Sequence, residues 1–457
     1  MRRRRLLASL VAMALVAGVA PASAGAAWTA PQTLSATGQD ADFAQVDIDA
    51  QGDAVFIWRR FDGTNQRIQA RARSASGVLS PIQNLSAAGQ NAFDPQLAVD
   101  TDGDAVFIWR RFDGTNQRIQ ARARSAAGTL GPVQNLSAAG QNAFNPQMAV
   151  DADGDAVFTW QRSEGAQWRI QARARSAAGT LSPIQNLTAA ERGTQYPEVG
   201  VSPQGRAIFT WRQFVPIASY CCWRIEARAR SAAGALGPVQ TLSPPPGTDQ
   251  NAYFPQVGVN AQGGAVFSWQ LREPGEGPRG TGRLQARARS AAGVLSPVQF
   301  ISTRAGDGGG AGGTLAVDPA GNAVFTWTFS YSYVDGAAGS AQVQVRARSA
   351  SGTLSPIQDL TRRAGDLGGR NSQVGVDDAG DAVVTWDRYQ NDELRSVGAQ
   401  VRSAAGALGP LQTFSFAGQH YLGPRPQVAV NGSGDAVLTW EDSDATNSGV
   451  IQAAAGP

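Results

Sequence analysis

The chain has 457 residues, and its 39 basic residues, all of them arginine, slightly outnumber its 36 acidic residues, which gives a formal net charge of +3. Four of the arginines, Arg2 to Arg5, stand at the extreme N-terminus, and without them the formal charge is −1. Non-specific binding to nucleic acid depends on a net excess of positive charge, so this balance argues against a nucleic-acid partner.

Residues 1–24 have the features of a secretory signal peptide. The four arginines precede an apolar run from Leu6 to Val19, and Ala22-Ser23-Ala24 supplies the small residues of a cleavage site. The run is shorter than the ~20 apolar residues of a membrane span, and no later stretch has that character. We therefore predict a secreted, extracellular protein without an integral membrane segment after removal of the leader. Sec and twin-arginine export both stay open.

One motif dominates residues 25–457. The string GDAVFIWRRFDGTNQRIQARARS occupies residues 52–74 and recurs letter for letter at residues 103–125. Its core, a glycine followed six positions later by a tryptophan, occurs eight times, and the tryptophans are Trp58, Trp109, Trp160, Trp211, Trp269, Trp327, Trp386 and Trp440. The spacing of 51 to 59 residues is typical of propeller blades and too long for small helical or leucine-rich repeats.

Each repeat divides into four strand-like pieces, such as PQLAVD, DAVFIWRR, RIQARARS and SPIQNLS. β-branched and aromatic residues, or period-two alternation, mark the first three. An Asp-x-x-Gly turn or a close variant joins the first piece to the second, and a Ser-Ala-x-Gly turn joins the third to the fourth. Both tight turns fall on one edge of a blade, so the longer, variable connections share the opposite face, where binding residues usually gather.

The two ends of the chain complement each other. Residues 28–35, WTAPQTLS, match a fourth strand with no first three before it, and the last repeat stops at a third strand, VIQAAAGP. Pairing of these ends removes the exposed edges of an open array. We therefore predict an all-β fold, a single eight-bladed propeller of four-stranded antiparallel blades over residues 25–457, closed by the N-terminal strand in the C-terminal blade.

The segment LAVDPAGNAVFTW, at residues 315–327, resembles the hairpin of NHL-type and related secreted propeller repeats. The resemblance covers the first two strands of each repeat. It implies the fold and nothing about a substrate, because propellers carry binders, lyases, hydrolases and scaffolds alike.

Three recurrent features favour structural roles. Residues 151–155, DADGD, look like a calcium loop but lack the glutamate that an EF-hand needs, so we predict a turn, no metal and no cofactor. Arg71 and Arg73 share a strand face next to Asp53, which predicts an ion pair; an anion-binding arginine stripe is the alternative. The eight tryptophans predict blade packing more strongly than a sugar platform.

Aromatic residues of the variable connections are the ligand candidates. With the sole histidine counted among them, they are Trp168, Phe214, Tyr220, Trp223, Phe329, Tyr331, Tyr333, Tyr389, His420 and Tyr421. Cys221 and Cys222, the only cysteines, are adjacent; a strained disulfide between them would stiffen this loop, and two free thiols or bridges to another chain are the alternatives.

Each first strand also carries a polar residue that we expect at the mouth of the central channel. This ring consists of Gln45, Gln96, Gln147, Glu198, Gln256, Thr314, Gln373 and Gln427. Solvation of the channel lining is the favoured interpretation, and hydrogen bonding to a polar ligand such as a glycan is the alternative. Glu198 is the single acid of the ring.

The sequence gives little support for catalysis. His420 is the sole histidine, which excludes histidine-based metal clusters and leaves any triad dependent on one exposed loop residue. Carboxylates that could approach the variable face are Glu191, Glu198, Asp249, Glu273, Asp387 and Glu393, and their spacing establishes no catalytic separation. We predict an exported, monomeric, non-catalytic protein that recognises a glycan, a cell-envelope component or a protein. A glycan-active hydrolase or lyase is the alternative, and a structural scaffold comes third.

Overall fold

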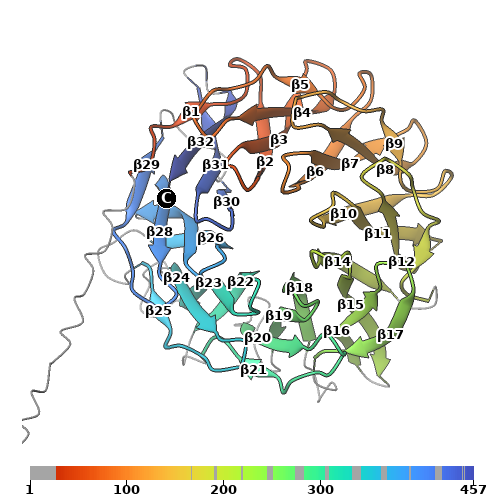
Figure 1. Ribbon diagram of the computed structural model, residues 1–457, viewed down its shortest axis with the longest axis vertical. Coiled ribbons are helices and arrows are strands. Elements are labelled where there is room, and N and C mark those ends of the chain that lie inside the picture. The colour runs from red at the N-terminus through yellow and green to blue at the C-terminus, as the bar shows by residue number, and fades with distance from the viewer. Residues whose placement is uncertain are drawn as a thin grey trace, which may run out of the picture.

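A computed structural model describes residues 27–165, 167–189, 193–217, 220–243, 251–272, 282–303, 308–331, 341–361, 368–390, 393–416, 425–444, 446 and 448–456. Within these ranges the chain is all-β, with thirty-two strands in eight four-stranded antiparallel sheets. The sheets stand around a central axis as the blades of a propeller (Figure 1). The predicted fold class, the number of blades and the number of strands per blade are confirmed.

The strands fall into four sets according to their position in the blade. The first strands are β2 (Ala41–Ile48), β6 (Ala92–Val99), β10 (Ala143–Val150), β14 (Thr194–Val201), β18 (Asn251–Val259), β22 (Gly308–Val317), β26 (Gly368–Val376) and β30 (Gln427–Val430). The second strands are β3 (Ala54–Phe61), β7 (Ala105–Phe112), β11 (Ala156–Glu164), β15 (Ala207–Ile217), β19 (Ala265–Arg272), β23 (Ala323–Tyr331), β27 (Ala382–Gln390) and β31 (Ala436–Ser443).

The third strands are β4 (Gln66–Arg73), β8 (Gln117–Arg124), β12 (Gln167–Arg175), β16 (Tyr220–Arg230), β20 (Gly282–Arg289), β24 (Ala341–Arg348), β28 (Glu393–Arg402) and β32 (Gly449–Gly456). The fourth strands are short: β5 (Gln83–Asn84), β9 (Gln134–Asn135), β13 (Gln185–Asn186), β17 (Leu236–Thr241), β21 (Gln299–Phe300), β25 (Gln358–Asp359), β29 (Gln412–Ser415) and β1 (Gln32–Thr33). We number the blades 1 to 8 from β2, so that blade 8 holds β30, β31, β32 and β1. First strands lie innermost and fourth strands outermost (Figure 1).

The eight repeated tryptophans form the core between blades, as predicted. Each is fully buried. Trp109 of blade 2 packs in one cluster with Ile57, Ile68 and Leu85 of blade 1, and the other blades repeat this contact. Burial of a large aromatic side chain at the same place in every blade explains why this position tolerates so little change.

The predicted ion pair between Asp53 and the arginines of β4 is wrong. Asp53 Oδ1 accepts a hydrogen bond from the backbone N–H of Ala75 (2.8 Å), which fixes the turn after β4. Arg73 Nε instead donates to Gln32 Oε1 (2.8 Å), and Gln32 Nε2 donates to the carbonyl of Gly77 (3.1 Å). Arg73 therefore joins neighbouring blades, since Gln32 belongs to blade 8. The anion-binding arginine stripe stays a prediction.

The N-terminal strand completes blade 8 and closes the ring. Gln32 and Thr33 pair with Ala453 and Gln452, and the backbone N–H of Leu34 donates to the carbonyl of Ile451 (2.8 Å). In Figure 1, β1 lies beside β32, at the outer edge of the blade that the C-terminus completes.

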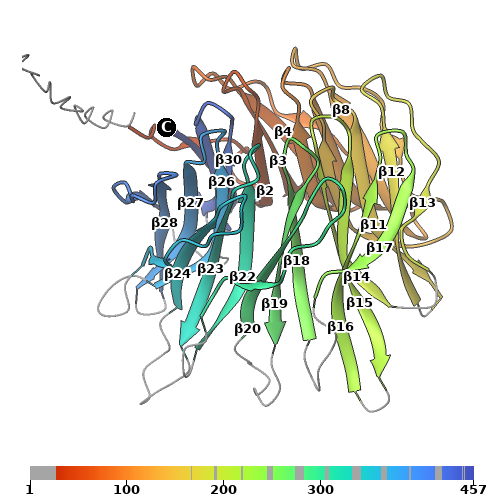
Figure 2. The same cartoon turned by 60° about the horizontal axis from the view of Figure 1, so that its bottom comes forward.

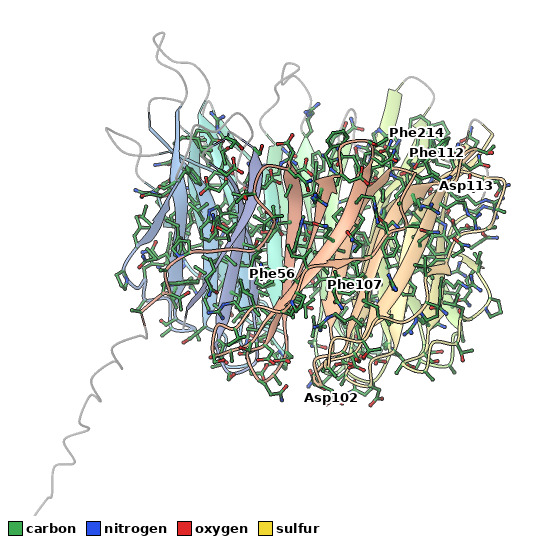
Figure 3. The ribbon with its side chains drawn as sticks, turned by 90° about the horizontal axis from the view of Figure 1, so that it is seen from above. Phe56, Asp102, Phe107, Phe112, Asp113 and Phe214 are labelled. Carbon is green, nitrogen blue, oxygen red and sulfur yellow. The ribbon has the colours of Figure 1, made fainter. Side chains whose placement is uncertain are left out.

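The two faces of the propeller differ as the repeat pattern predicts. Asp102, in the tight turn between β6 and β7, lies at one edge of the ring, whereas Phe112, Asp113 and Phe214 lie at the opposite edge (Figure 3). The turn predicted at residues 151–155 is confirmed, because Asp151 Oδ1 accepts hydrogen bonds from the backbone N–H groups of Asp153 and Asp155. We call the edge that carries Phe112 and Phe214 the loop-bearing face. The long hairpin β15–β16 extends from it (Figure 2).

Candidate functional site

The first strands enter the ring through a β-bulge at the loop-bearing face. In blades 1 to 7 the ladder shifts register just before the polar residue of the predicted ring. Seven residues at the bulge position have a left-handed backbone with φ between 45° and 54°: Phe43, Asp94, Asn145, Tyr196, Phe254, Asn371 and Arg425. We define the inner rim as these seven residues together with the residue that follows each core tryptophan: Arg59, Arg110, Gln161, Arg212, Gln270, Thr328, Asp387 and Glu441.

Three of the bulge residues are aromatic and exposed. Asparagine and aspartate tolerate a left-handed backbone, but a bulky side chain there is an outlier that costs about 1–2 kcal/mol. Phe43, Tyr196 and Phe254 nevertheless keep 38%, 41% and 50% of their surface exposed. Bulges next to functional sites re-aim side chains, and strain of this kind concentrates where a site requires it.

In blades 1 and 2 the inner rim carries arginines, each of which forms an ion pair with an aspartate. Arg59 Nε donates to Asp42 Oδ1 (2.7 Å), and Arg110 Nε donates to Asp94 Oδ2 (2.6 Å). The guanidinium of Arg59 also lies 4.4 Å from the ring centroid of Phe43. Because each arginine has a carboxylate partner, these two blades contribute packing and little net charge.

In blade 4 the same arginine sits in an aromatic cluster. The guanidinium of Arg212 lies 4.0 Å from the ring centroid of Trp223, 4.8 Å from that of Tyr196 and 5.0 Å from that of Tyr253. Tyr196 in turn lies 5.9 Å from Phe254 of blade 5. We call the group formed by Tyr196, Glu198, Arg212, Trp223, Tyr253 and Phe254 the blade 4–5 sector.

In blades 7 and 8 the inner rim is acidic. Asp387 is fully buried, accepts a hydrogen bond from Asn371 Nδ2 (2.6 Å) and leaves Oδ1 without a partner. Glu441 is 6% exposed and accepts a hydrogen bond from the backbone N–H of Phe43 (2.7 Å). Burial raises the pKa of Asp387 to about 7, to which repulsion by Glu441 adds, and burial also raises the pKa of Glu441 to about 7. At neutral pH each of these two carboxyl groups is therefore protonated in part of the molecules.

In blades 1 to 7 the residues of the predicted polar ring follow the bulge, so that Gln45 stands in the middle of β2 and pairs with Ile57. In blade 8, Gln427 opens β30. One hydrogen bond within the ring joins blades 3 and 4, since Gln147 Nε2 donates to Glu198 Oε1 (3.4 Å). Glu198 keeps partial exposure at the inner edge of blade 4, and desolvation by the surrounding protein atoms still raises its pKa to about 8.

The predicted aromatic ligand residues differ in burial and in the side chains that they contact. The prediction of Phe329 as a loop residue for ligand binding is wrong: it is 3% exposed in the core between blades 5 and 6. It stands two positions after Trp327 and therefore shares that residue's buried strand face. Trp168 is half-buried and packs edge-on against Phe144 (5.5 Å). Trp223 packs edge-on against Phe214 (5.3 Å). Tyr389 is half-buried, and the guanidinium of Arg370 lies 4.9 Å from its ring.

Several predicted residues stand in strands where a loop was expected, or lie outside the described part. Tyr220, Cys221 and Cys222 belong to β16, where the two cysteines pair with Pro216 and Val215, so the expected loop is an extended hairpin. The side chains of these three residues, of Tyr331 and of Glu393 lie outside the described part, and the disulfide stays a prediction. Residues Tyr333, His420, Tyr421, Glu191, Asp249 and Glu273, and the leader 1–24, lie outside the described residues.

Sequence reasoning missed Phe43, Arg212, Phe254 and Glu441. A signal was present for the bulge residues, since they vary at a fixed position two residues before the conserved polar ring. Nothing within one repeat indicates Glu441, because its partner Phe43 belongs to another blade at the other end of the chain.

Neither a metal centre nor a membrane helix is found in the described ranges. No group of three or more histidine, cysteine, aspartate or glutamate side chains is placed there to hold a metal ion. Those ranges also contain no helix with the length and apolar character to cross a membrane.

Comparisons with known proteins find distant similarity to solved structures alone. No family model matches the chain, and the comparison with curated proteins finds no match. Among solved structures, the GH93 α-L-arabinofuranosidase of Fusarium graminearum has a TM-score of 0.42 at 13% identity over 68% of this chain and 92% of that chain. The polysaccharide lyase Uly1 has a TM-score of 0.46 at 9% identity, over 82% and 91%. Prolyl oligopeptidase B from Galerina marginata has a TM-score of 0.49 at 10% identity, over 88% and 55%. At these identities and TM-scores the matches carry no argument about this chain.

Proposed function

We propose that this propeller is an exported binding protein that holds a carbohydrate chain across the inner rim of its loop-bearing face. The observation that carries the proposal is the exposure of Phe43, Tyr196 and Phe254 on a left-handed backbone. A bulge with a purely structural role would be served by glycine or asparagine at no steric cost. An aromatic side chain kept there despite the strain is explained by a contact that it makes outside the chain.

The chemistry around these aromatics suits a sugar. A sugar ring presents a face of C–H groups that packs against the electron-rich face of an aromatic ring, and its hydroxyl groups need both donors and acceptors. The inner rim supplies aromatic faces and, in other blades, the exposed amide groups of Asn145 and Asn371. The leader predicted at residues 1–24 would bring a monomeric protein to the polysaccharides of the cell envelope. Recognition of a protein or of another envelope component is the competing outcome of the experiments below.

Replacing either exposed aromatic of the blade 4–5 sector is expected to weaken binding strongly. Tyr196→Ala and Phe254→Ala should each raise the Kd for an oligosaccharide by roughly thirtyfold, because buried aromatic anchors contribute about 2 kcal/mol or more at interfaces. Isothermal titration calorimetry with ligands chosen from a glycan array measures the change.

Phe300→Ala is the matched control. Phe300 is 41% exposed, similar to Tyr196, but it lies on the outermost strand β21 of blade 5. Its removal should leave Kd unchanged. A glycan array without a single ligand, or equal weakening by all three substitutions, contradicts carbohydrate binding at the inner rim.

A glycan-active enzyme is the second candidate, and the acidic pair Asp387 and Glu441 favours it. Glycoside cleavage usually employs two carboxyl groups, a general acid with a raised pKa and an ionised partner that acts as base or nucleophile. Asp387 is fully buried, so a substrate would reach it only after a rearrangement, and binding is therefore the better-supported function. Release of reducing ends or unsaturated sugars by the wild type, abolished in Asp387→Asn, would favour the enzyme.

A further inference from the structure

Blade 4 carries an arginine charge at the inner rim that no acidic group of the described chain compensates. Arg59 and Arg110 occupy the same position in blades 1 and 2 and pair with Asp42 and Asp94. In blade 4 the two corresponding bulge positions hold Gln195 and Tyr196, and Arg212 donates to Gln195 Oε1 without forming an ion pair within the described ranges. Unlike Arg59 and Arg110, Arg212 therefore brings to the blade 4–5 sector a positive charge that no described carboxylate pairs with.

This charge is held in place. Three aromatic rings, those of Trp223, Tyr196 and Tyr253, surround the guanidinium of Arg212 at 4.0 to 5.0 Å. Arg272 of blade 5 lies 5.4 Å from the ring centroid of Tyr253, and it too forms no ion pair among the described residues. A partly desolvated cation acts on a ligand more strongly than one in bulk water.

Glu198 adds a hydrogen-bond donor to the same sector. It stands two positions after Tyr196 on β14, where six of the eight blades carry glutamine. Its neighbours Gln147 and Thr210 are uncharged: Gln147 donates to Glu198 Oε1, and Thr210 is its ladder partner on β15. Gln256 occupies the equivalent position in blade 5. With its pKa raised to about 8 by desolvation, the carboxyl group is protonated at pH 7 and can donate through O–H.

We propose that the blade 4–5 sector selects an acidic sugar unit, whose ring stacks on Tyr196 and Phe254 while its carboxylate lies near Arg212 and accepts a hydrogen bond from Glu198. This inference rests on the proposed carbohydrate binding and adds the class of the sugar. A neutral sugar would leave the fixed arginine charge without a partner. An acidic sugar provides one, and the neutral carboxyl of Glu198 avoids the repulsion that an ionised acid would exert on it.

The experiment uses the full protein and paired probes. Oligogalacturonate, oligomannuronate and a hyaluronan oligosaccharide are each titrated beside their carboxyl-reduced forms, which keep the sugar backbone and lose the charge. We expect at least one acidic probe to bind about tenfold or more tightly than its reduced form, a difference of about 1.4 kcal/mol. Equal affinity for both members of every pair overturns the inference and leaves carbohydrate binding standing, whereas no binding to any probe removes both.

Two substitutions borrowed from sister blades assign the roles. Arg212→Gln installs the residue that blades 3 and 5 carry at this position, as Gln161 and Gln270, and should abolish the preference for the acidic probe. Arg67→Gln is the control, because Arg67 lies on β4 outside the inner rim, pairs with Asp62, and is glutamine (Gln342) at the same position of blade 6; it should keep the preference. A preference that survives Arg212→Gln overturns the inference.

The role of Glu198 is tested through pH. Between pH 7 and pH 9 the wild type should lose roughly tenfold in affinity for the acidic probe, because ionised Glu198 loses its donor and repels the carboxylate. Glu198→Gln, which matches the ring residue of most blades, keeps a donor at every pH and should change less than about threefold. Equal pH dependence in the two proteins excludes Glu198 from the site.

Discussion

Deletion of residues 27–35 is expected to lower the free energy of unfolding by at least about 5 kcal/mol, because it opens the ring. The deletion removes the fully buried Leu34, the ladder of β1 with β32, and the contact of Trp28 with Phe414, whose ring centroids are 5.6 Å apart. It also exposes the edge of β32, which becomes a template for association with another chain. Chemical denaturation followed by tryptophan fluorescence measures the loss, and light scattering detects the association.

A pair of point variants tests the same claim if the shortened chain does not fold. Leu34→Ala and Leu85→Ala remove the same leucine from two blades, one at the closure and one inside the chain, and both side chains are fully buried. If the N-terminal strand is an integral part of blade 8, the two variants should lose similar amounts, about 2–5 kcal/mol each. A much smaller loss of unfolding free energy for Leu34→Ala would mean that the ring is stable without the terminal strand.

The features that the sequence predicts correctly are those encoded inside one repeat. A tryptophan at the sixth position after a turn glycine appears eight times, and a four-residue turn after the third strand appears seven times, so chance similarity is excluded. The closure follows from counting strands at the two ends. These features depend on local periodicity and on turn chemistry, which short segments determine.

The features that the sequence does not predict arise between repeats. Asp53 and Arg73 look like partners along the hairpin, yet Arg73 reaches Gln32 of the adjacent blade and Asp53 binds a turn. Likewise, Glu441 meets Phe43 across the closure of the ring. Strand patterns state which face a residue occupies but not which neighbour that face meets, so contacts across blades require the assembled structure.

The exposed aromatics illustrate a further physical limit. A bulge changes the direction of one side chain without changing the composition of the strand around it. Phe254 reads as an ordinary apolar strand residue, but its left-handed backbone turns the side chain outward. Phe329 is the converse case, since it looked like a loop aromatic and the alternation that starts at Trp327 buries it.

Stability is expected to fall as pH rises from 5 to 8, because of the buried acids at the inner edge of the ring. Burial raises the pKa of Asp387 from 3.8 to about 7, that of Glu441 from 4.5 to about 7 and that of Glu198 from 4.5 to about 8. Between the unfolded and folded values the native state holds protons that the unfolded chain has released. Unfolding therefore becomes easier as pH rises through this window, and the contribution is lost above the folded pKa. For Asp387 a shift of about three units corresponds to roughly 4 kcal/mol.

Asp387→Asn is the variant that isolates this effect, because the amide keeps an oxygen for Asn371 Nδ2 and cannot ionise. At pH 5 the variant should match the wild type, in which Asp387 is protonated, and at pH 8 it should be the more stable of the two, with a flatter dependence of the unfolding midpoint on pH. Asp62→Asn is the control of opposite sign, since backbone N–H groups of Asn65 and Thr64 lower the pKa of Asp62 and its ionised form is the stabilising one. That variant should lose stability at pH 8 and keep the wild-type slope between pH 5 and pH 8. If the wild-type midpoint rises over this range, or if Asp387→Asn keeps the full slope, the carboxyl group of Asp387 is ionised in the folded protein, and the case for a neutral acid beside Glu441 is lost.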